Sequence, residues 1–376
     1  MRLDCEGGAI IRSALIKSSQ SKEGVVMVPL TLLTNEARRE QFGRRRRSKI
    51  VSMKAQVVLA AIAFTSTLVN ATQVPPHFPD AVVALGSTRP LVSGPPCAVQ
   101  WVTEGTGFLY GYLAKDDPDP TKRMYAVYLV TNRHVVEDHA TTQAISRLQQ
   151  AQSVQSGENC GTTFTAEGMI SVRMNPLNSS LQGRKFDLPV KDWFYHPNKD
   201  VDIAAIRPNP QSLKTEGLQD VFFANDIIVA NKEKLKAKGV TAGDGVFVLG
   251  FPMNLAGIQR NYVIVRQGCI ARISEMLDGT SPSYLVDAFI FPGNSGSPVI
   301  LKPEVSSISG TPTQTTAYLV GIVKSYIPYI DVAFSPQTKS ARITFEENSG
   351  LAEVLPADYI DEAIKAWSGS PSQPKQ

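Results

Sequence analysis

The sequence predicts an all-β protein of the sandwich or barrel type. Its 376 residues are 43% hydrophobic and 19% charged, an ordinary globular composition with room for one large core or two smaller ones. Short apolar runs, several rich in β-branched and aromatic residues, alternate with Gly, Pro, Asn and Asp. Strands alternating with long helices are not seen, which disfavours a doubly wound α/β fold. The predicted strands include 81–85, 107–112, 126–131, 246–249, 262–265, 284–290 and 317–323.

Two segments interrupt this strand pattern, and a helix is expected near the end. Residues 140–183 are rich in Gln, Ser, Thr and Asn and predict a long decorated loop, and residues 302–316 predict a surface loop. We assign residues 351–367 to a C-terminal helical segment whose helix begins at Pro356, because its apolar side chains fall at helical spacing. Residues 368–376 are expected to form a disordered tail.

The net charge of +4 is unevenly distributed along the chain. Residues 1–71 carry a net charge of +7, whereas residues 72–376 carry −3. Nucleic-acid-binding proteins attract phosphates with clustered Lys and Arg. The remainder after residue 71 has no such excess, so a nucleic-acid partner is disfavoured for the folded part.

The basic N-terminal segment has the parts of a secretory signal. Four arginines occupy 44–47, and Met53-Lys54 precedes an apolar stretch at 57–69 that ends in small or aliphatic residues. We therefore expect a signal peptide at 53–71, residues 1–52 as an upstream extension or misassigned start, and a protein that is secreted to the periplasm or the extracellular space. A long or twin-arginine-like signal whose upstream half is genuine is the alternative. The stretch is too short and too interrupted by hydroxyl residues for a stable membrane span.

Four cysteines occur, at Cys5, Cys97, Cys160 and Cys269. Cys5 would be lost with the signal, and export would permit one disulfide among the other three. The sequence does not indicate which two of these three cysteines form the disulfide, and the third would remain as a buried thiol. None of the four has metal-site spacing. The chemistry considered below implies neither a metal nor another cofactor.

The segment FPGNSGSPV at 291–299 predicts a nucleophile at Ser295. A serine hydroxyl needs an exposed, fixed position beside a base, and flanking glycines allow the tight turn that provides it. The same turn can aim the amides of Gly293 and Ser295 at one point, where they would stabilise an oxyanion. An α/β-hydrolase elbow would require glycine at Ser297 and a following helix, whereas Pro298 starts an apolar run typical of a strand.

The candidate base is His134, which stands where the apolar run YLVT ends in a polar turn. The other histidines of the mature chain, His77, His139 and His196, are interpreted as solvated or turn residues. The orienting acid should be an aspartate at the start of a buried strand. Asp202 directly precedes an Ile-Ala-Ala-Ile run and is preferred to Asp200, because an unpaired carboxylate there would be costly.

Three motifs together resemble those of the chymotrypsin-like (trypsin-like) serine proteases, particularly the exported bacterial branch. TNRHVV resembles the family's histidine motif, DIAAI its aspartate motif, and DAFIFPGNSGSPVI its serine motif, in the family's chain order. GTGF at 105–108, GDGVFVLGFP at 243–252, LVGIV at 319–323 and NSGLAEVLP at 348–356 add to a similarity that spans about residues 80–367.

The resemblance implies two antiparallel six-stranded β-barrels with a C-terminal helix. The barrels would comprise residues 72–215 and 216–350, with the catalytic residues in the cleft between them. The implied function is a serine endopeptidase that hydrolyses protein or peptide substrates through a Ser-His-Asp triad and an acyl-enzyme. A catalytically weak protein of this fold that binds peptides, and a membrane-tethered protease with an uncleaved signal, are the alternatives.

Departures from the family concern activation and specificity. Asn294 stands where many animal enzymes have an aspartate that pairs with a newly cut N-terminus, so the resemblance implies no such switch. Phe289 stands where trypsins carry an acid at the pocket base, which argues against a preference for Lys or Arg. Lys324 and Tyr326 stand where the family has small substrate-contacting residues, so they could narrow the pocket or reach an acidic side chain. A strand-edge lysine without a substrate role is the alternative for Lys324.

Overall fold

The computed structural model of the chain describes residues 73–90, 99–139, 165–166, 168–218, 221–304 and 313–369. All of these residues belong to one compact unit, Asn70–Gln376. The expected signal and upstream extension, three of the cysteines and the tail after Gly369 lie outside the described residues. Cys269 is described and carries a free thiol. Within these ranges, no helix combines the length and apolarity needed to cross a membrane.

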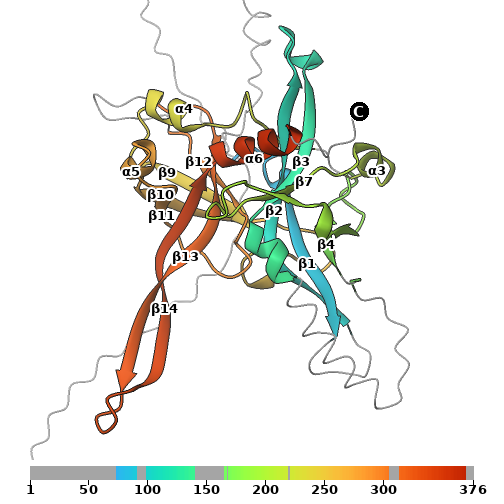
Figure 1. Cartoon of the computed structure of the whole chain (residues 1–376). Helices are drawn as coiled ribbons and strands as arrows, with labels where there is room; N and C mark the ends of the chain where they lie inside the picture. The colour runs from blue at the N-terminus through green and yellow to red at the C-terminus, as the bar shows by residue number, and fades with distance from the viewer. Residues whose placement is uncertain are drawn as a thin grey trace, which may run out of the picture. The chain divides into compact units, whose positions relative to one another are not determined.

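The first sheet has eight strands in the order β5-β4-β1-β2-β3-β7-β6, with β8 added in parallel to β2 (Figure 1). Their bounds are β1 Val82–Pro90, β2 Val99–Lys115, β3 Met124–Thr131, β4 Met169–Met174, β5 Arg184–Pro189, β6 Phe194–Tyr195, β7 Ala204–Ile206 and β8 Phe223–Ala224. The strands β5 and β6 are the two ends of this sheet, so it is an open half-barrel rather than the closed six-stranded barrel of the prediction. The parallel pairing of β8 also places residues 223–224 with the first sheet, not with the predicted 216–350 barrel.

The second sheet is a closed barrel of six strands in the order β10-β11-β14-β13-β12-β9. Its strands are β9 Gly245–Gly250, β10 Ile264–Arg272, β11 Tyr284–Asp287, β12 Pro298–Leu301, β13 Tyr318–Phe334 and β14 Ala341–Pro356. The predicted all-β, chymotrypsin-like fold class with a C-terminal helix is confirmed by this architecture.

The C-terminal helix α6 is Asp358–Ser368, and it buries Ile360, Ala363 and Ile364. The prediction that a helical segment begins at 351, with its first turn at Pro356, is wrong. Residues 351–356 finish β14, where Pro356 pairs with Gly321. A residue that precedes proline is biased toward extended backbone, which favours continuation of the strand up to this point.

Shorter helices connect the strands. They are α3 Pro210–Thr215, α4 Lys232–Ala237, α5 Ser274–Leu277, the 3-10 turns η1 Pro79–Ala81, η2 Pro120–Lys122, η3 Val190–Asp192 and η4 Pro252–Asn254, and a helical segment at 133–139. The predicted 140–183 loop is corrected in part, because β4 runs through it and is almost entirely buried. The apolar Met, Ile and Val of β4 pack into the first sheet, a signal that the polar composition of the surrounding residues outweighed. Of the predicted 302–316 loop, 305–312 lies outside the described residues.

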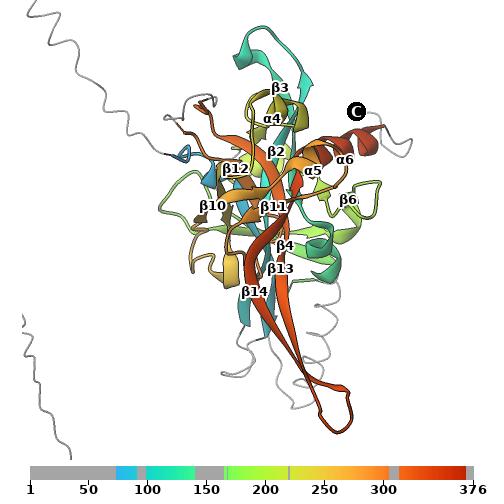
Figure 2. The same cartoon turned by 90° about the vertical axis from the view of Figure 1, so that its left-hand side faces the viewer.

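The strands β13 and β14 extend past the barrel as a two-stranded ribbon, visible as the long projection in Figures 1 and 2. Pairing in this ribbon continues from Pro328 with Asn348 to Phe334 with Ala341. Lys324 and Tyr326 lie in β13 just before the ribbon. These two of the three predicted substrate-contacting residues are therefore at the base of the ribbon.

Three buried apolar clusters make up the core. One cluster lies inside the closed barrel, and another packs on the strands of the first sheet. The third joins side chains of both sheets with the buried face of α6, including Phe108, Phe223, Phe247 and Ile360. Because this third cluster holds the two sheets against each other, residues from both can be positioned at one site between them.

Candidate active site

The predicted nucleophile Ser295 lies in a tight turn that ends where β12 begins. Gly293 and Gly296 have φ values of +97° and +84°, in the left-handed region that favours glycine. A Cβ at Gly293 would lie 2.4 Å from the carbonyl oxygen of Phe251, and one at Gly296 would lie 2.0 Å from that of Thr106. Both glycines of the GNSGS motif are therefore required by backbone conformation and by close approach.

Thr106 of β2 fixes this turn from the first sheet. Its amide donates to the carbonyl of Ser295 at 2.8 Å, and its Oγ1 donates to the carbonyl of Gly293 at 2.7 Å. On the other side, the amide of Gly296 donates to the carbonyl of Val323 at 3.0 Å. The turn is thus held between β2 of one sheet and β13 of the other.

The amides of Gly293 and Ser295 have no hydrogen-bond partner among the described residues. The carbonyl of Pro292 accepts from the amide of Met253 at 2.7 Å. The N–H of a trans peptide points opposite to its C=O, so the Gly293 amide points away from Met253. Two unpaired donors in one tight turn are therefore available to a ligand oxygen.

His134 and Asp202 are brought together by the pairing of β3 with β7. Thr131 at the end of β3 lies opposite Ala204 of β7, so the residues just beyond each strand meet. The Asp202 carboxylate accepts from the His134 amide at 3.0 Å through Oδ1, and its Oδ2 lies 2.6 Å from His134 Nδ1. Asn132 Nδ2 donates to the Asp202 carbonyl at 2.8 Å and secures the backbone. Asp200, the disfavoured candidate, is exposed.

The contact between His134 and Asp202 shifts their pKa values in opposite directions. Burial alone would lower the pKa of His134, but the hydrogen bond and charge of Asp202 raise it above its usual value. Asp138 adds to the increase and Lys324 opposes it. Burial alone would raise the pKa of Asp202, but the hydrogen bonds and charge of His134 lower it. Each group therefore favours the charged form of the other, the imidazolium of His134 and the carboxylate of Asp202.

The helical segment that carries His134 and the turn that carries Ser295 meet at Gly105. A Cβ at Gly105 would lie 2.6 Å from Val135 Cγ1 and 3.4 Å from the carbonyl oxygen of Ser295. The Ser295 hydroxyl donates to the carbonyl of Lys324 at 3.4 Å, and among the described residues no hydrogen bond joins it to His134. The segments that carry the two residues are neighbours at Gly105, and the hydroxyl is directed toward β13.

The three predicted substrate-pocket residues have different surroundings. Phe289 is 59% exposed. Lys324 Nζ lies 3.0 Å from the Glu353 carboxylate, so its charge is already paired. The Tyr326 hydroxyl donates to Glu346 at 2.5 Å. Lys324 is therefore not free to pair with an acidic side chain of a substrate unless it leaves Glu353.

The interpretation of His139 as a solvated residue is wrong. His139 is 1% exposed, with Nδ1 2.5 Å from Glu104 Oε2 and Nε2 2.6 Å from the Met169 carbonyl. His196 lies in a turn but is 5% exposed, and its Nε2 contacts Glu362 at 3.2 Å. His77 makes an edge-on ring contact with Phe78. The partners of the two buried histidines are distant in sequence, so no local pattern could have revealed them.

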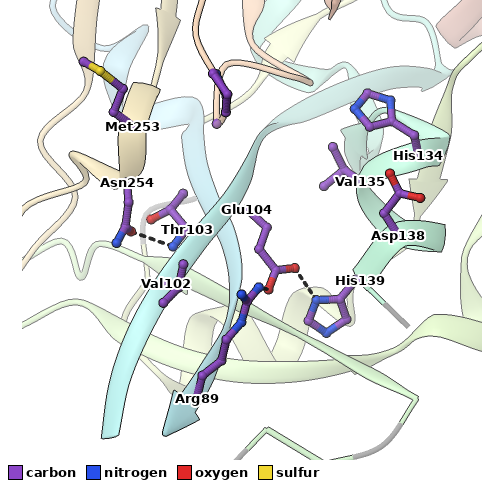
Figure 3. A pocket seen from close by; sticks show the side chains of 12 residues that line it. Arg89, Val102, Thr103, Glu104, His134, Val135, Asp138, His139, Met253 and Asn254 are labelled. Atoms are coloured by element: carbon purple, nitrogen blue, oxygen red, sulfur yellow. Dashed lines mark hydrogen bonds and ion pairs between the residues drawn. The ribbon is translucent and has the colours of Figure 1, made fainter. Parts of the chain in front are cut away.

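A cavity of about 410 Å³ opens beside His134 (Figure 3). We call it the His134 cavity. Glu104 lies in it between Arg89 and His139 and bonds to both, and Asn254 Oδ1 accepts from the Thr103 amide at 2.6 Å. The remaining lining comes from residues on both sides of the nucleophile turn, namely Val102, His134, Val135, Asp138, Met253, Pro292 and Gly293. No motif along the chain indicates this cavity, because its walls come from separate strands and turns.

Comparison with known proteins identifies the family. A family model described as a trypsin-like peptidase domain matches residues 105–304, just over half of the chain. No curated protein matches the sequence. Among solved structures, the chain is similar to the crystal structure of Rv3671c from M. tuberculosis H37Rv, a serine-to-alanine mutant in its inactive form. The identity is 14% and the TM-score 0.35, over 80% of this chain and 91% of that chain. On the family match, the chain belongs to the trypsin-like peptidases.

Proposed function

We propose that the protein is a serine endopeptidase that cleaves peptide bonds through Ser295, His134 and Asp202 and an acyl-enzyme intermediate. Membership in a peptidase family makes proteins or peptides its substrates. The observation that carries the proposal is the His134–Asp202 hydrogen bond of 2.6 Å beside a turn with two unpaired amides.

In the proposed reaction, His134 Nε2 takes the proton of Ser295 as Oγ attacks the substrate carbonyl. Asp202 holds the other proton on Nδ1 and stabilises the imidazolium that forms. The amides of Gly293 and Ser295 donate to the oxyanion, and His134 returns its proton to the leaving amine. Water then hydrolyses the acyl-enzyme by the reverse proton transfers.

The Ser295 hydroxyl must turn from the Lys324 carbonyl toward His134 for this chemistry. The change is a rotation about one side-chain bond, and the existing 3.4 Å contact is long for a hydroxyl hydrogen bond. Catalytic hydrogen bonds are often long or poorly aligned before substrate binds. The same contact favours the alternative, a protein of this fold that binds peptides without useful turnover.

Covalent labelling tests the proposal. A fluorophosphonate or sulfonyl fluoride probe requires an activated hydroxyl, so we expect it to modify Ser295 in the folded chain. Ser297 is fully buried in the same turn and serves as an internal control that should stay unmodified. Peptide mapping by mass spectrometry locates the label. Ser295 left unmodified at millimolar probe would favour the peptide-binding alternative.

The rate of hydrolysis should depend on the protonation of His134. A general base must be neutral, so kcat/KM should rise as His134 loses its proton. Because the pKa of His134 is raised, the midpoint of this rise should lie above about 6.5, the value of a free histidine. Asp138→Asn removes one charge that raises this pKa and should move the midpoint to lower pH. Its neighbour Glu137→Gln is the matched control; an equal shift in both variants would contradict the assignment.

A further inference from the structure

A second cavity, of about 460 Å³, adjoins the proposed active site. It is lined by Trp101, Arg173 and Lys185 together with the loop 254–258, and we call it the basic cavity. Asn254 lines both this cavity and the His134 cavity. The two cavities are therefore neighbours across one side chain.

Arg173 brings a buried charge to the basic cavity without a counter-charge. The residue is only 4% exposed, and its guanidinium lies 4.5 Å from the centre of the Trp101 ring. Nε donates to Asn261 Oδ1 at 2.7 Å and Nη2 to the Ala256 carbonyl at 2.8 Å, and both acceptors are neutral. Nη1 has no hydrogen-bond partner among the described residues. Burial lowers the pKa of Arg173, because a desolvated cation with neutral partners is disfavoured.

Lys185 places a second positive charge beside the first. It lies directly opposite Arg173 in the pairing of β4 with β5, and like charges at such a position repel. Its ammonium lies 5.9 Å from the centre of the same Trp101 ring. Burial and the charge of Arg173 lower the pKa of Lys185, and Asp187 opposes them without forming an ion pair. Arg89 and Lys324, in contrast, each contact a carboxylate.

The strand β2 connects the nucleophile turn to the basic cavity. Thr106 binds the turn, Thr103 binds Asn254, and Trp101 lies in the basic cavity. Five residues of regular strand span about 16 Å, at about 3.3 Å per residue, and the bulge at Glu104 shortens this path slightly. An extended substrate that follows β2 would cover the same distance with about five residues.

A substrate half that follows β2 from the nucleophile turn would be the leaving-group half. His134, which would protonate the leaving amine, lines the first cavity on this path. Phe289, Lys324 and Tyr326 line neither cavity. If those three residues contact the acyl half of the substrate, the half beyond the cleaved bond passes through the His134 cavity toward Trp101.

We propose that the basic cavity binds a carboxylate of the substrate about five residues after the cleaved bond, so that the enzyme selects polypeptides that are acidic there. This assignment rests on the proposed endopeptidase function. The carboxylate would accept from Arg173 Nη1 and Lys185 Nζ and would offset the repulsion between the two cations. Charge-assisted bonds of this kind correspond to a preference of about 10-fold.

A positional series of peptides tests the proposal. The peptides share one cleavage sequence and carry Glu or Gln at each of the third to seventh positions after the bond. We expect the ratio of kcat/KM for Glu over Gln to reach about 10-fold at one or two adjacent positions near the fifth. The ratio should fall toward 1 in Lys185→Gln, and it should fall further in Lys185→Glu, because the new carboxylate repels the Glu peptide. A ratio near 1 at every position overturns the proposal.

Arg184→Gln is the matched control. Arg184 and Lys185 are both exposed neighbours on β5 and carry the same charge, but only Lys185 lines the basic cavity. Both also line a different cavity, with Asn209 and Glu216. Replacement of Arg184 should leave the ratio unchanged, and an equal loss would show that general surface charge is responsible. Sulfate separates a substrate carboxylate from a free anion. It should lower the ratio by competing with the Glu peptide; an equal effect of sulfate on Glu and Gln peptides would assign the cavity to free anions.

Binding to Ser295→Ala separates this inference from the proposed function. Fluorescently labelled Glu and Gln peptides are titrated with the full-length variant, with and without Lys185→Gln. We expect about 10-fold tighter binding of the Glu peptide, lost when Lys185 is replaced. Selective binding without hydrolysis by the wild type would refute the Ser295 mechanism and retain the basic cavity. If the wild type hydrolyses the Glu and Gln peptides at equal rates and the variant binds them equally, the basic cavity is refuted and the Ser295 mechanism is retained.

Discussion

Replacing Ser295 by alanine is expected to lower kcat by about 10⁵- to 10⁶-fold. The substitution removes the atom that would form the acyl-enzyme, and the remaining turn can only bind substrate and polarise its carbonyl. The hydroxyl has one contact with a described residue, the 3.4 Å bond to the Lys324 carbonyl. The turn is held by backbone bonds to Thr106 and Val323 instead, so the fold should be retained. Hydrolysis of a fluorogenic peptide and the melting temperature are measured together.

Ser297→Ala is a suitable control for this variant. Ser297 lies in the same turn but is fully buried, and its Oγ contacts Asn294 Nδ2 at 3.4 Å. Its replacement should act on stability and leave measurable hydrolysis. A Ser295→Ala rate within about tenfold of the wild type would exclude this serine as the nucleophile, since a nucleophile's loss costs far more.

Asp202→Asn should lower kcat by about 10⁴-fold with little effect on KM. Asp202 Oδ1 accepts from the His134 amide and Oδ2 lies at His134 Nδ1. An asparagine can keep its oxygen on the backbone amide only by presenting its NH₂ group to Nδ1. The imidazole must then accept at Nδ1 and carry its proton on Nε2, which leaves no lone pair for the proton of Ser295.

Asp200→Asn provides the comparison for this loss. The residue is exposed two positions away, and its amide, not its carboxylate, bonds to Asn198. We expect its kcat to stay within about twofold of the wild type, as surface substitutions usually have small effects. A similar loss in both variants would indicate a disturbed loop rather than a tautomer effect.

Local chemistry made part of the site predictable from the sequence. Gly293 and Gly296 are dictated by positive φ, and a histidine after a buried strand must lie at the strand's end. Asp202 was preferred to Asp200 because it precedes an apolar run, and the structure places Asp202, not Asp200, against His134. The catalytic roles of these residues remain proposals.

Long-range pairing explains what could not be predicted. Whether residues 351–356 form a helix or a strand depends on β11 and β13 beside them, since Pro356 is acceptable at the end of either element. His139 depends on Glu104, 35 positions away in the sequence. The basic cavity combines Trp101 of β2 with Arg173 and Lys185 of β4 and β5, and no spacing along the chain relates them.

Thr106 makes the shape of the nucleophile turn depend on both sheets at once. It bonds to Ser295, Gly293 and Phe251, and its own carbonyl accepts from Thr131 at 2.7 Å within the first sheet. The order of events during folding follows from this arrangement. The strands of each sheet pair within that sheet, whereas the turn has its full set of bonds only after the two sheets have docked. Catalytic competence should therefore be among the last properties to return on refolding and among the first to be lost when the sheets separate.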